Sequence, residues 1–158
     1  VGGLDVEEYG IWFSRDLGAG GKLAFAVGFS TKDLATAAPA AGGDQETTGG
    51  SISWLHPSGW NVTFATSNVE NDAGKDSDFN YVKVGYKTGK HAFSADFGMG
   101  DDQVAVGDEA ESLGFQYVFS PTKAVDLYAG FKSVSLDRAG GVTFEDIKTV
   151  TLGSRVKF

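Results

Sequence analysis

The segment Lys148–Phe158, Lys-Thr-Val-Thr-Leu-Gly-Ser-Arg-Val-Lys-Phe, predicts the class of fold to which the chain belongs. Because side chains alternate between the two faces of an extended strand, the segment would have one apolar and one polar face. The apolar face would carry Val150, Leu152, Val156 and Phe158, and the other face threonine, glycine, arginine and lysine. Such strands are typical of a transmembrane β-barrel, where one face meets lipid and the other meets a water-filled lumen.

The composition of the chain also indicates an all-β fold. The chain has 158 residues, the size of one domain, with 23 Gly, 12 Phe, three Pro and no Cys. These proportions suit short strands joined by turns, and no apolar run is long enough for a membrane helix. The absence of Cys excludes disulfides, thiolate metal sites and thiol nucleophiles. The net charge of −8 argues against nucleic acid as a partner.

The alternating pattern of the closing segment repeats along the whole chain. It predicts about nine strands, each close to the length that crosses an outer membrane. The first strand is expected at Val6–Asp16 and the second at Lys22–Lys32. In the second, large apolar residues such as Phe25 and Val27 alternate with Ala, Gly and Ser, which suits a lipid-facing wall around a lumen.

The connections between the predicted strands alternate between short and long. The short ones are Gly- or Pro-containing turns at Leu17–Gly21, Pro57–Gly59, Gly89–Lys90 and Ser120–Ala124, whereas the long ones are acidic and polar. Up-and-down outer-membrane barrels have short periplasmic turns and longer external loops. Aromatic residues gather beside the short turns and are predicted to form a girdle at the membrane interface. This girdle would comprise Phe13, Trp54, Trp60, Tyr86, Phe93, Tyr117, Phe119 and Phe158.

The closing segment and the repeated strands resemble those of the Gram-negative outer-membrane general porins, whose chains end on Phe after alternating apolar residues. The resemblance implies an antiparallel up-and-down transmembrane β-barrel of sixteen strands in the bacterial outer membrane. It also implies a homotrimer, in contact with lipid and lipopolysaccharide, with no cofactor. The implied function is a water-filled channel for passive diffusion of small hydrophilic solutes and ions.

The predicted strand number bears on how much of such a barrel the chain contains. A complete bacterial barrel has an even number of strands and both chain ends in the periplasm. If the short turns are periplasmic, the first strand enters from the outside and residues 1–7 end an external loop. We therefore expect residues 1–158 to be a single β-barrel domain that forms the C-terminal portion of a larger porin barrel.

Two alternatives are also compatible with the sequence. A complete eight-stranded outer-membrane barrel with an anchoring or adhesion role and no open pore would fit the length. A soluble antiparallel sandwich would also have alternating strands. Small residues at the predicted inward positions favour an open channel over an interior filled by side chains. These residues are Ala24, Ala26, Gly28, Gly85, Gly114 and Gly130.

The candidate functional residues are charged side chains on the predicted inward face. Charges of both signs on a lumen wall set the electric field that acts on passing ions. The candidates for lumen-lining charged residues are Lys83, Lys87, Asp96, Asp126, Lys132, Arg155 and Lys157.

The sequence gives little support for a metal site or an enzyme. Asp72, Asp76 and Asp78 are weak candidates for calcium ligands, because Ca²⁺ binds several carboxylate oxygens on loops, but their spacing matches no EF-hand. The two histidines, His56 and His91, have no Asp or Ser at a spacing that suggests a catalytic triad. The prediction is therefore a protein that is not an enzyme.

Overall fold

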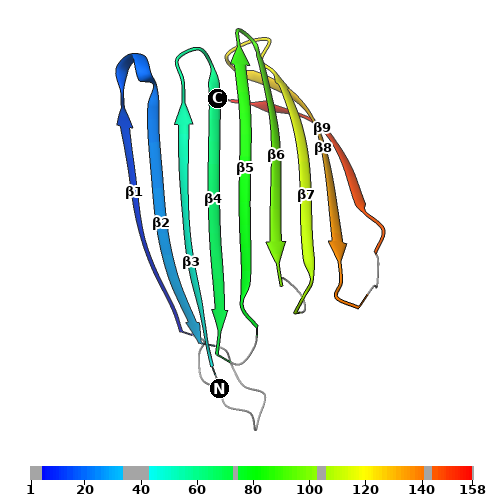
Figure 1. Ribbon diagram of the computed structural model, residues 1–158. Coiled ribbons are helices and arrows are strands. Elements are labelled where there is room, and N and C mark those ends of the chain that lie inside the picture. The colour runs from blue at the N-terminus through cyan, green and yellow to red at the C-terminus, as the bar shows by residue number, and fades with distance from the viewer. Residues whose placement is uncertain (1–4, 34–42, 73–74, 103–105, 141–143, 158) are drawn as a thin grey trace.

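The computed structural model describes residues 5–33, 43–72, 75–102, 106–140 and 144–157. These residues form one antiparallel sheet in which every strand pairs with the next strand along the chain (Figure 1). This confirms the prediction of an all-β chain with about nine strands. In this part of the chain the strands are β1 (Val6–Asp16), β2 (Lys22–Asp33), β3 (Asp44–Leu55), β4 (Trp60–Asn71), β5 (Ser77–Thr88), β6 (His91–Asp101), β7 (Glu109–Phe119), β8 (Val125–Asp137) and β9 (Ile147–Val156).

Antiparallel neighbours place successive connections at opposite ends of the sheet. The connections after β1, β3, β5 and β7 lie together at the top of Figure 1, and we call this end the short-turn rim. A single 3₁₀ turn, η1 (Gly18–Gly20), lies in the first of them. The strand ends that adjoin the remaining connections lie at the opposite end of the sheet, which we call the long-loop rim. The described part of the chain contains no helix of the length and apolarity that a membrane crossing requires.

The short turn between β3 and β4 depends on a glycine that packs against a neighbouring strand. Gly59 has a positive φ of 98°, a conformation that other residues adopt with strain. A Cβ atom at this position would overlap the backbone carbonyl oxygen of Lys87 in β5. The Lys87 N–H in turn donates a hydrogen bond of 2.9 Å to the Gly59 carbonyl. The turn is thereby joined to the end of the next hairpin.

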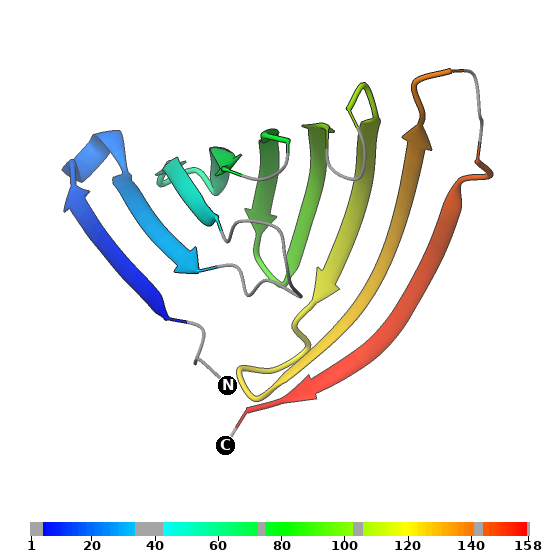
Figure 2. The ribbon, with the colours of Figure 1, turned by 90° about the horizontal axis from the view of Figure 1, so that it is seen from below.

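The sheet is strongly curved but not closed. Figure 2 shows the strands arranged in an open arc, with β1 and β9 as its two edges. An eight-stranded closed barrel does not agree with nine described strands whose edge strands are not neighbours in the sheet. A two-layer sandwich does not agree with the structure either, because all nine strands belong to a single sheet.

No apolar side chain is buried within the described residues. Large apolar residues lie on one face of the sheet and are exposed, for example Ile11 at 72% and Leu152 at 77%. An exposed apolar face of this extent is far larger than soluble proteins tolerate. The alternate residues on the other face are mainly small, polar or charged, and many of them are half-buried. The greater crowding of this polar face is what the concave side of a curved sheet produces.

The tryptophans divide between the two faces. Trp54 and Trp60 flank the β3–β4 turn on the apolar face, where Trp54 pairs with Leu23 and Trp60 with Tyr86. Trp12 alternates with polar and small residues of β1, so it lies on the polar face, where it is 68% exposed. No role was predicted for this aromatic residue from the sequence.

Candidate functional site

Three of the predicted lumen charges lie in one row across the polar face. The strand register places Lys83 of β5 opposite Asp96 of β6, Asp96 opposite Gly114 of β7, and Gly114 opposite Lys132 of β8. We call Lys83, Asp96 and Lys132 the mid-wall row, because they lie near the middle of their strands. All three line a groove of about 300 Å³. The row carries two positive charges and one negative charge.

The position of the Asp96 carboxylate depends on the glycine beside it. A Cβ atom on Gly114 would overlap both carboxylate oxygens of Asp96. The Asp96 side chain therefore lies over Gly114, in the space between the two lysines of the row. None of the ion pairs found among the described residues involves Asp96. Its half-buried carboxylate is thus available to an ion in the groove.

At other inward glycines, too, a larger neighbouring side chain occupies the space that a Cβ atom would fill. A Cβ atom on Gly85 would overlap the Asn61 side-chain amide, and one on Gly153 would overlap the Tyr128 ring. The small size of the predicted inward residues favours open space beside them. The structure shows instead that, at Gly85 and Gly114, a neighbouring side chain occupies part of that space. This could not be predicted without the register between strands.

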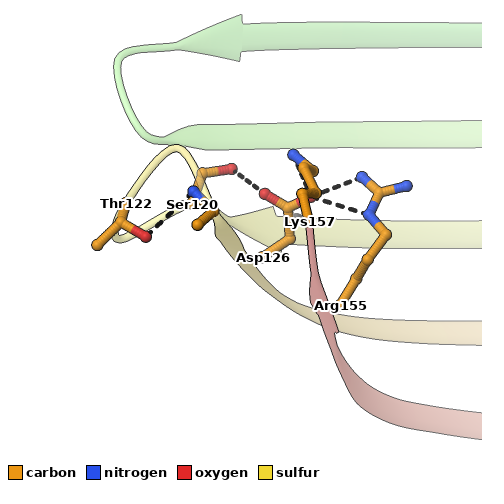
Figure 3. Close-up of polar contacts among 6 residues, drawn as sticks. Ser120, Thr122, Asp126, Arg155 and Lys157 are labelled. Atoms are coloured by element: carbon orange, nitrogen blue, oxygen red, sulfur yellow. Dashed lines mark hydrogen bonds and ion pairs between the residues drawn. The ribbon is translucent and has the colours of Figure 1, made fainter.

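Three further predicted charges form a cluster at the short-turn rim (Figure 3). The Asp126 carboxylate accepts hydrogen bonds from Arg155 Nη2 at 2.5 Å and Nε at 3.1 Å. Lys157 Nζ lies 2.8 Å from the same oxygen, and Ser120 Oγ donates to the other oxygen at 2.7 Å. Asp126 is only 2% exposed, so these donors supply the partners that a buried carboxylate needs. We call Ser120, Asp126, Arg155 and Lys157 the rim cluster.

The alternation in the sequence predicts Asp126, Arg155 and Lys157 on the polar face, but it does not predict that they contact one another. Asp126 pairs with Arg155 in the strand register, which a register prediction for the last hairpin could have found. The contact of Ser120 with Asp126 could not be predicted from the sequence, because serine is a common residue in turns. Lys87, the seventh predicted lumen charge, is exposed on the polar face near the short-turn rim and belongs to neither group.

The predicted girdle residues that the structure describes lie on the apolar face near the short-turn rim, and several of them are in contact. Trp60 and Tyr86 have ring centroids 4.7 Å apart, and Phe93 and Tyr117 have centroids 5.0 Å apart. Phe158 lies outside the described residues. The rings of Phe13 and Phe25 in β2 have centroids 5.3 Å apart. Phe25 was not among the residues predicted for the girdle.

Two polar contacts complete this aromatic band. The Trp54 indole N–H donates to the Gly20 carbonyl at 2.8 Å, so its polar end points to the turn and its ring to the apolar face. His91 stacks on Tyr117 and Phe119, and its Nδ1 lies 2.7 Å from the Tyr117 hydroxyl. His91 is therefore held by its aromatic neighbours Tyr117 and Phe119.

The three candidate calcium ligands have different partners. Asp72 accepts from the Asp44 N–H at 3.3 Å, Asp76 from the Asn71 N–H at 3.0 Å, and Asp78 from the Asn68 amide at 2.9 Å. Among the residues that the structure describes, no group of three or more His, Cys, Asp or Glu side chains could hold a metal ion. Within the described residues, the three candidate aspartates therefore do not form the ligand group of a metal site.

Comparison with known proteins identifies the family of the chain. The solved structure of an anion-selective porin from Comamonas acidovorans has a similar fold, with a TM-score of 0.69 at 19% sequence identity. The match covers 96% of this chain and 49% of that porin, so the chain spans about half of its length. A search of curated proteins finds no match. A family model described as Gram-negative porin matches residues 7–139, which is most of the sequence. This confirms the resemblance inferred from the closing strand, and the chain belongs to the Gram-negative porin family.

Proposed function

We propose that the chain forms part of the wall of a water-filled channel, through which small hydrophilic solutes and ions diffuse passively. As a member of the Gram-negative porin family, it is a protein of the bacterial outer membrane. The observation that carries the proposal is the single curved sheet, with an exposed apolar face on one side and a crowded polar face on the other. Lipid and lipopolysaccharide would cover the apolar face, and water would fill the space beside the polar face.

In this proposal the protein selects solutes without catalytic turnover. Size exclusion by the barrel and the field of the wall charges decide what passes. The mid-wall row supplies this field halfway along the wall, with Lys83 and Lys132 flanking the Asp96 carboxylate. Because the row has one more positive than negative charge, it favours anions over cations at that depth.

We also propose that the chain is the C-terminal portion of a larger, sixteen-stranded barrel that assembles as a homotrimer. The support is that β1 and β9 are edges of a sheet that is curved but open. Unpaired backbone N–H and C=O groups are costly inside a bilayer, so both edges need further strands. The similar porin, about twice as long, offers a precedent for a barrel of that size.

The channel proposal is tested by conductance of the purified native protein in planar bilayers. The double variant Lys83→Gln/Lys132→Gln should lower the ratio of chloride to potassium permeability by about two- to fivefold, and Asp96→Asn should raise it. Lys148→Gln is the control, because Lys148 alternates with the apolar residues of β9. Absence of any conductance, or equal ratios in all variants, would contradict the proposal.

The larger-barrel proposal has a separate test. The native-source protein would be analysed on a denaturing gel with and without boiling. The expected result is a boiled band near twice the 16.6 kDa of this chain, with a heat-sensitive trimer before boiling. A boiled band at the mass of this chain alone would exclude the sixteen-stranded barrel.

A further inference from the structure

A second polar feature lies at the short-turn rim, outside the mid-wall row. The end of β5, the β5–β6 turn, the β7–β8 turn and the residue after β9 line a pocket of about 500 Å³. We call it the basic pocket, because four lysines line it and none of its described lining residues is acidic. The polar side chains of the basic pocket are Lys87, Lys90, Ser120, Thr122, Lys123 and Lys157.

Two of the four lysines are held in place by hydrogen bonds. Lys90 Nζ donates to the Pro121 carbonyl at 2.9 Å, which ties the β5–β6 turn to the β7–β8 turn. Lys157 Nζ contacts the Asp126 carboxylate at 2.8 Å. An ammonium group has three N–H donors, so each of these lysines keeps two donors for another acceptor.

The other two lysines have no acidic partner. Lys87 and Lys123 are exposed, and no ion pair among the described residues includes either of them. The Thr122 hydroxyl accepts from the Ala124 N–H at 3.3 Å, which leaves its own proton free to donate. The basic pocket thus has positive charge and hydrogen-bond donors that nothing in the described chain satisfies.

The charge of this rim is opposite to that of the whole chain. The chain has a net charge of −8, yet only Asp16 and Asp126 among its 21 acidic residues lie at the short-turn rim. Asp126 is already paired with Arg155 and Lys157. Seven of the 13 basic residues lie at this rim, namely Arg15, Lys22, Lys87, Lys90, Lys123, Arg155 and Lys157.

We propose that the basic pocket binds the phosphate group of a small soluble solute, with inorganic phosphate as the simplest case. Several ammonium groups and a hydroxyl group can surround a compact anion of two charges and donate charge-assisted hydrogen bonds to its oxygens. Lys87 lies on the polar face. In the proposed channel, a soluble solute would therefore reach the basic pocket from the water beside that face. Binding at this rim goes beyond the proposed channel, because it requires no passage of the solute through the lumen.

The proposal is tested by isothermal titration calorimetry of the native protein, in non-ionic detergent at low salt, with inorganic phosphate. The double variant Lys87→Gln/Lys123→Gln should weaken phosphate binding about tenfold, and Lys123→Gln alone about threefold. Lys22→Gln is the matched control, because Lys22 lies at the same rim but outside the basic pocket. Its affinity for phosphate should be unchanged.

Three outcomes would overturn the proposal: no binding of phosphate to the native protein, equal affinities in the double variant and the control, or binding only of micelles that carry a phospholipid phosphate. Chloride at the same ionic strength should give no comparable heat. Conductance of the same variants separates this proposal from the proposed function. A conducting protein that does not bind phosphate refutes only the basic pocket, and a protein that binds phosphate without conducting refutes only the channel.

Discussion

At the scale of single residues, Asp126 joins parts of the chain that are distant in sequence. Its carboxylate contacts Ser120 before β8 and both Arg155 and Lys157 at the end of β9. The Lys157 N–H also donates to the Ala124 carbonyl at 2.8 Å. Because a carboxylate removed from water requires donors around it, these contacts fix the end of the last strand against the preceding turn.

Replacing the central carboxylate should therefore loosen the last hairpin. In Asp126→Asn, two cations lose their counter-ion and one of them faces an amide N–H₂ group. We expect a lower urea concentration at the unfolding midpoint, measured by circular dichroism of the protein in lipid vesicles. Asp146→Asn is the control, since Asp146 pairs with Lys148 at 3.6 Å between exposed side chains, and such pairs contribute little. Equal midpoints for the two variants would contradict this role of Asp126.

The turn glycines allow a second comparison between single residues. Gly59→Ala adds a Cβ atom that meets the Lys87 carbonyl, in addition to the strain of a positive φ. We expect a loss of about 2–4 kcal/mol in the free energy of unfolding. Gly89→Ala has positive φ but open space around the added atom, so the strain alone should cost about 1 kcal/mol. A larger loss in Gly89→Ala than in Gly59→Ala would show that the contact with β5 is unimportant.

At the scale of elements, the two faces of each strand are the property that the sequence predicts best. In β7, Leu113, Phe115 and Tyr117 lie on the apolar face, and Gly114 and Gln116 alternate with them on the polar face. In the proposed channel, neighbouring residues of one strand would therefore meet different solvents, with lipid on one side and water on the other. The same new charge should have opposite consequences at adjacent positions.

A lysine placed on either face of β7 tests this difference. Phe115→Lys puts an ammonium group on the apolar face near the middle of the strand, where Phe115 is 51% exposed. It should lower the free energy of unfolding from vesicles by about 2–4 kcal/mol. Gln116→Lys puts the same group on the polar face, so it should leave stability nearly unchanged and raise the relative permeability to anions. Equal destabilisation by both variants would argue against a lipid-facing apolar side.

The sequence predicted the elements more completely than the contacts between them. The first strand was expected at Val6–Asp16, as observed, and the second ended one residue early, at Lys32 instead of Asp33. The alternation of apolar and polar residues within one strand is a local pattern, so it can be recognised in the sequence alone. Register between strands decides two contacts: the position of the Asp96 side chain over Gly114 and the pairing of Asp126 with Arg155. Local sequence patterns do not specify this register.

At the scale of the whole molecule, charge is separated along the strand direction. Of the 21 acidic residues, all but Asp16, Asp96 and Asp126 lie toward the long-loop rim, whereas basic residues predominate at the short-turn rim. An ion that moves along the polar face from one rim to the other would therefore meet mainly acidic residues at the long-loop rim and mainly basic residues at the short-turn rim. Such an arrangement acts on ions over distances set by the salt concentration.

The charge separation predicts an asymmetric current–voltage curve. At about 0.01 M salt the Debye length is about 30 Å, so both rims act on ions throughout the passage. At about 1 M salt it falls to about 3 Å, and the asymmetry should disappear. Bilayer recordings of oriented channels at both concentrations would check this. A symmetric curve at low salt would show that the rim charges do not reach the conduction path.

Because the three tryptophans are divided between the two faces, their fluorescence can report separately on the surroundings of each face. Trp54 and Trp60 lie on the apolar face, and Trp12 lies exposed on the polar face. Brominated phospholipids should quench the fluorescence of the first two, and aqueous iodide that of the third. A Trp54→Phe/Trp60→Phe double variant would then emit light that responds to iodide alone. Its emission would report on the solvent beside the polar face without any attached dye.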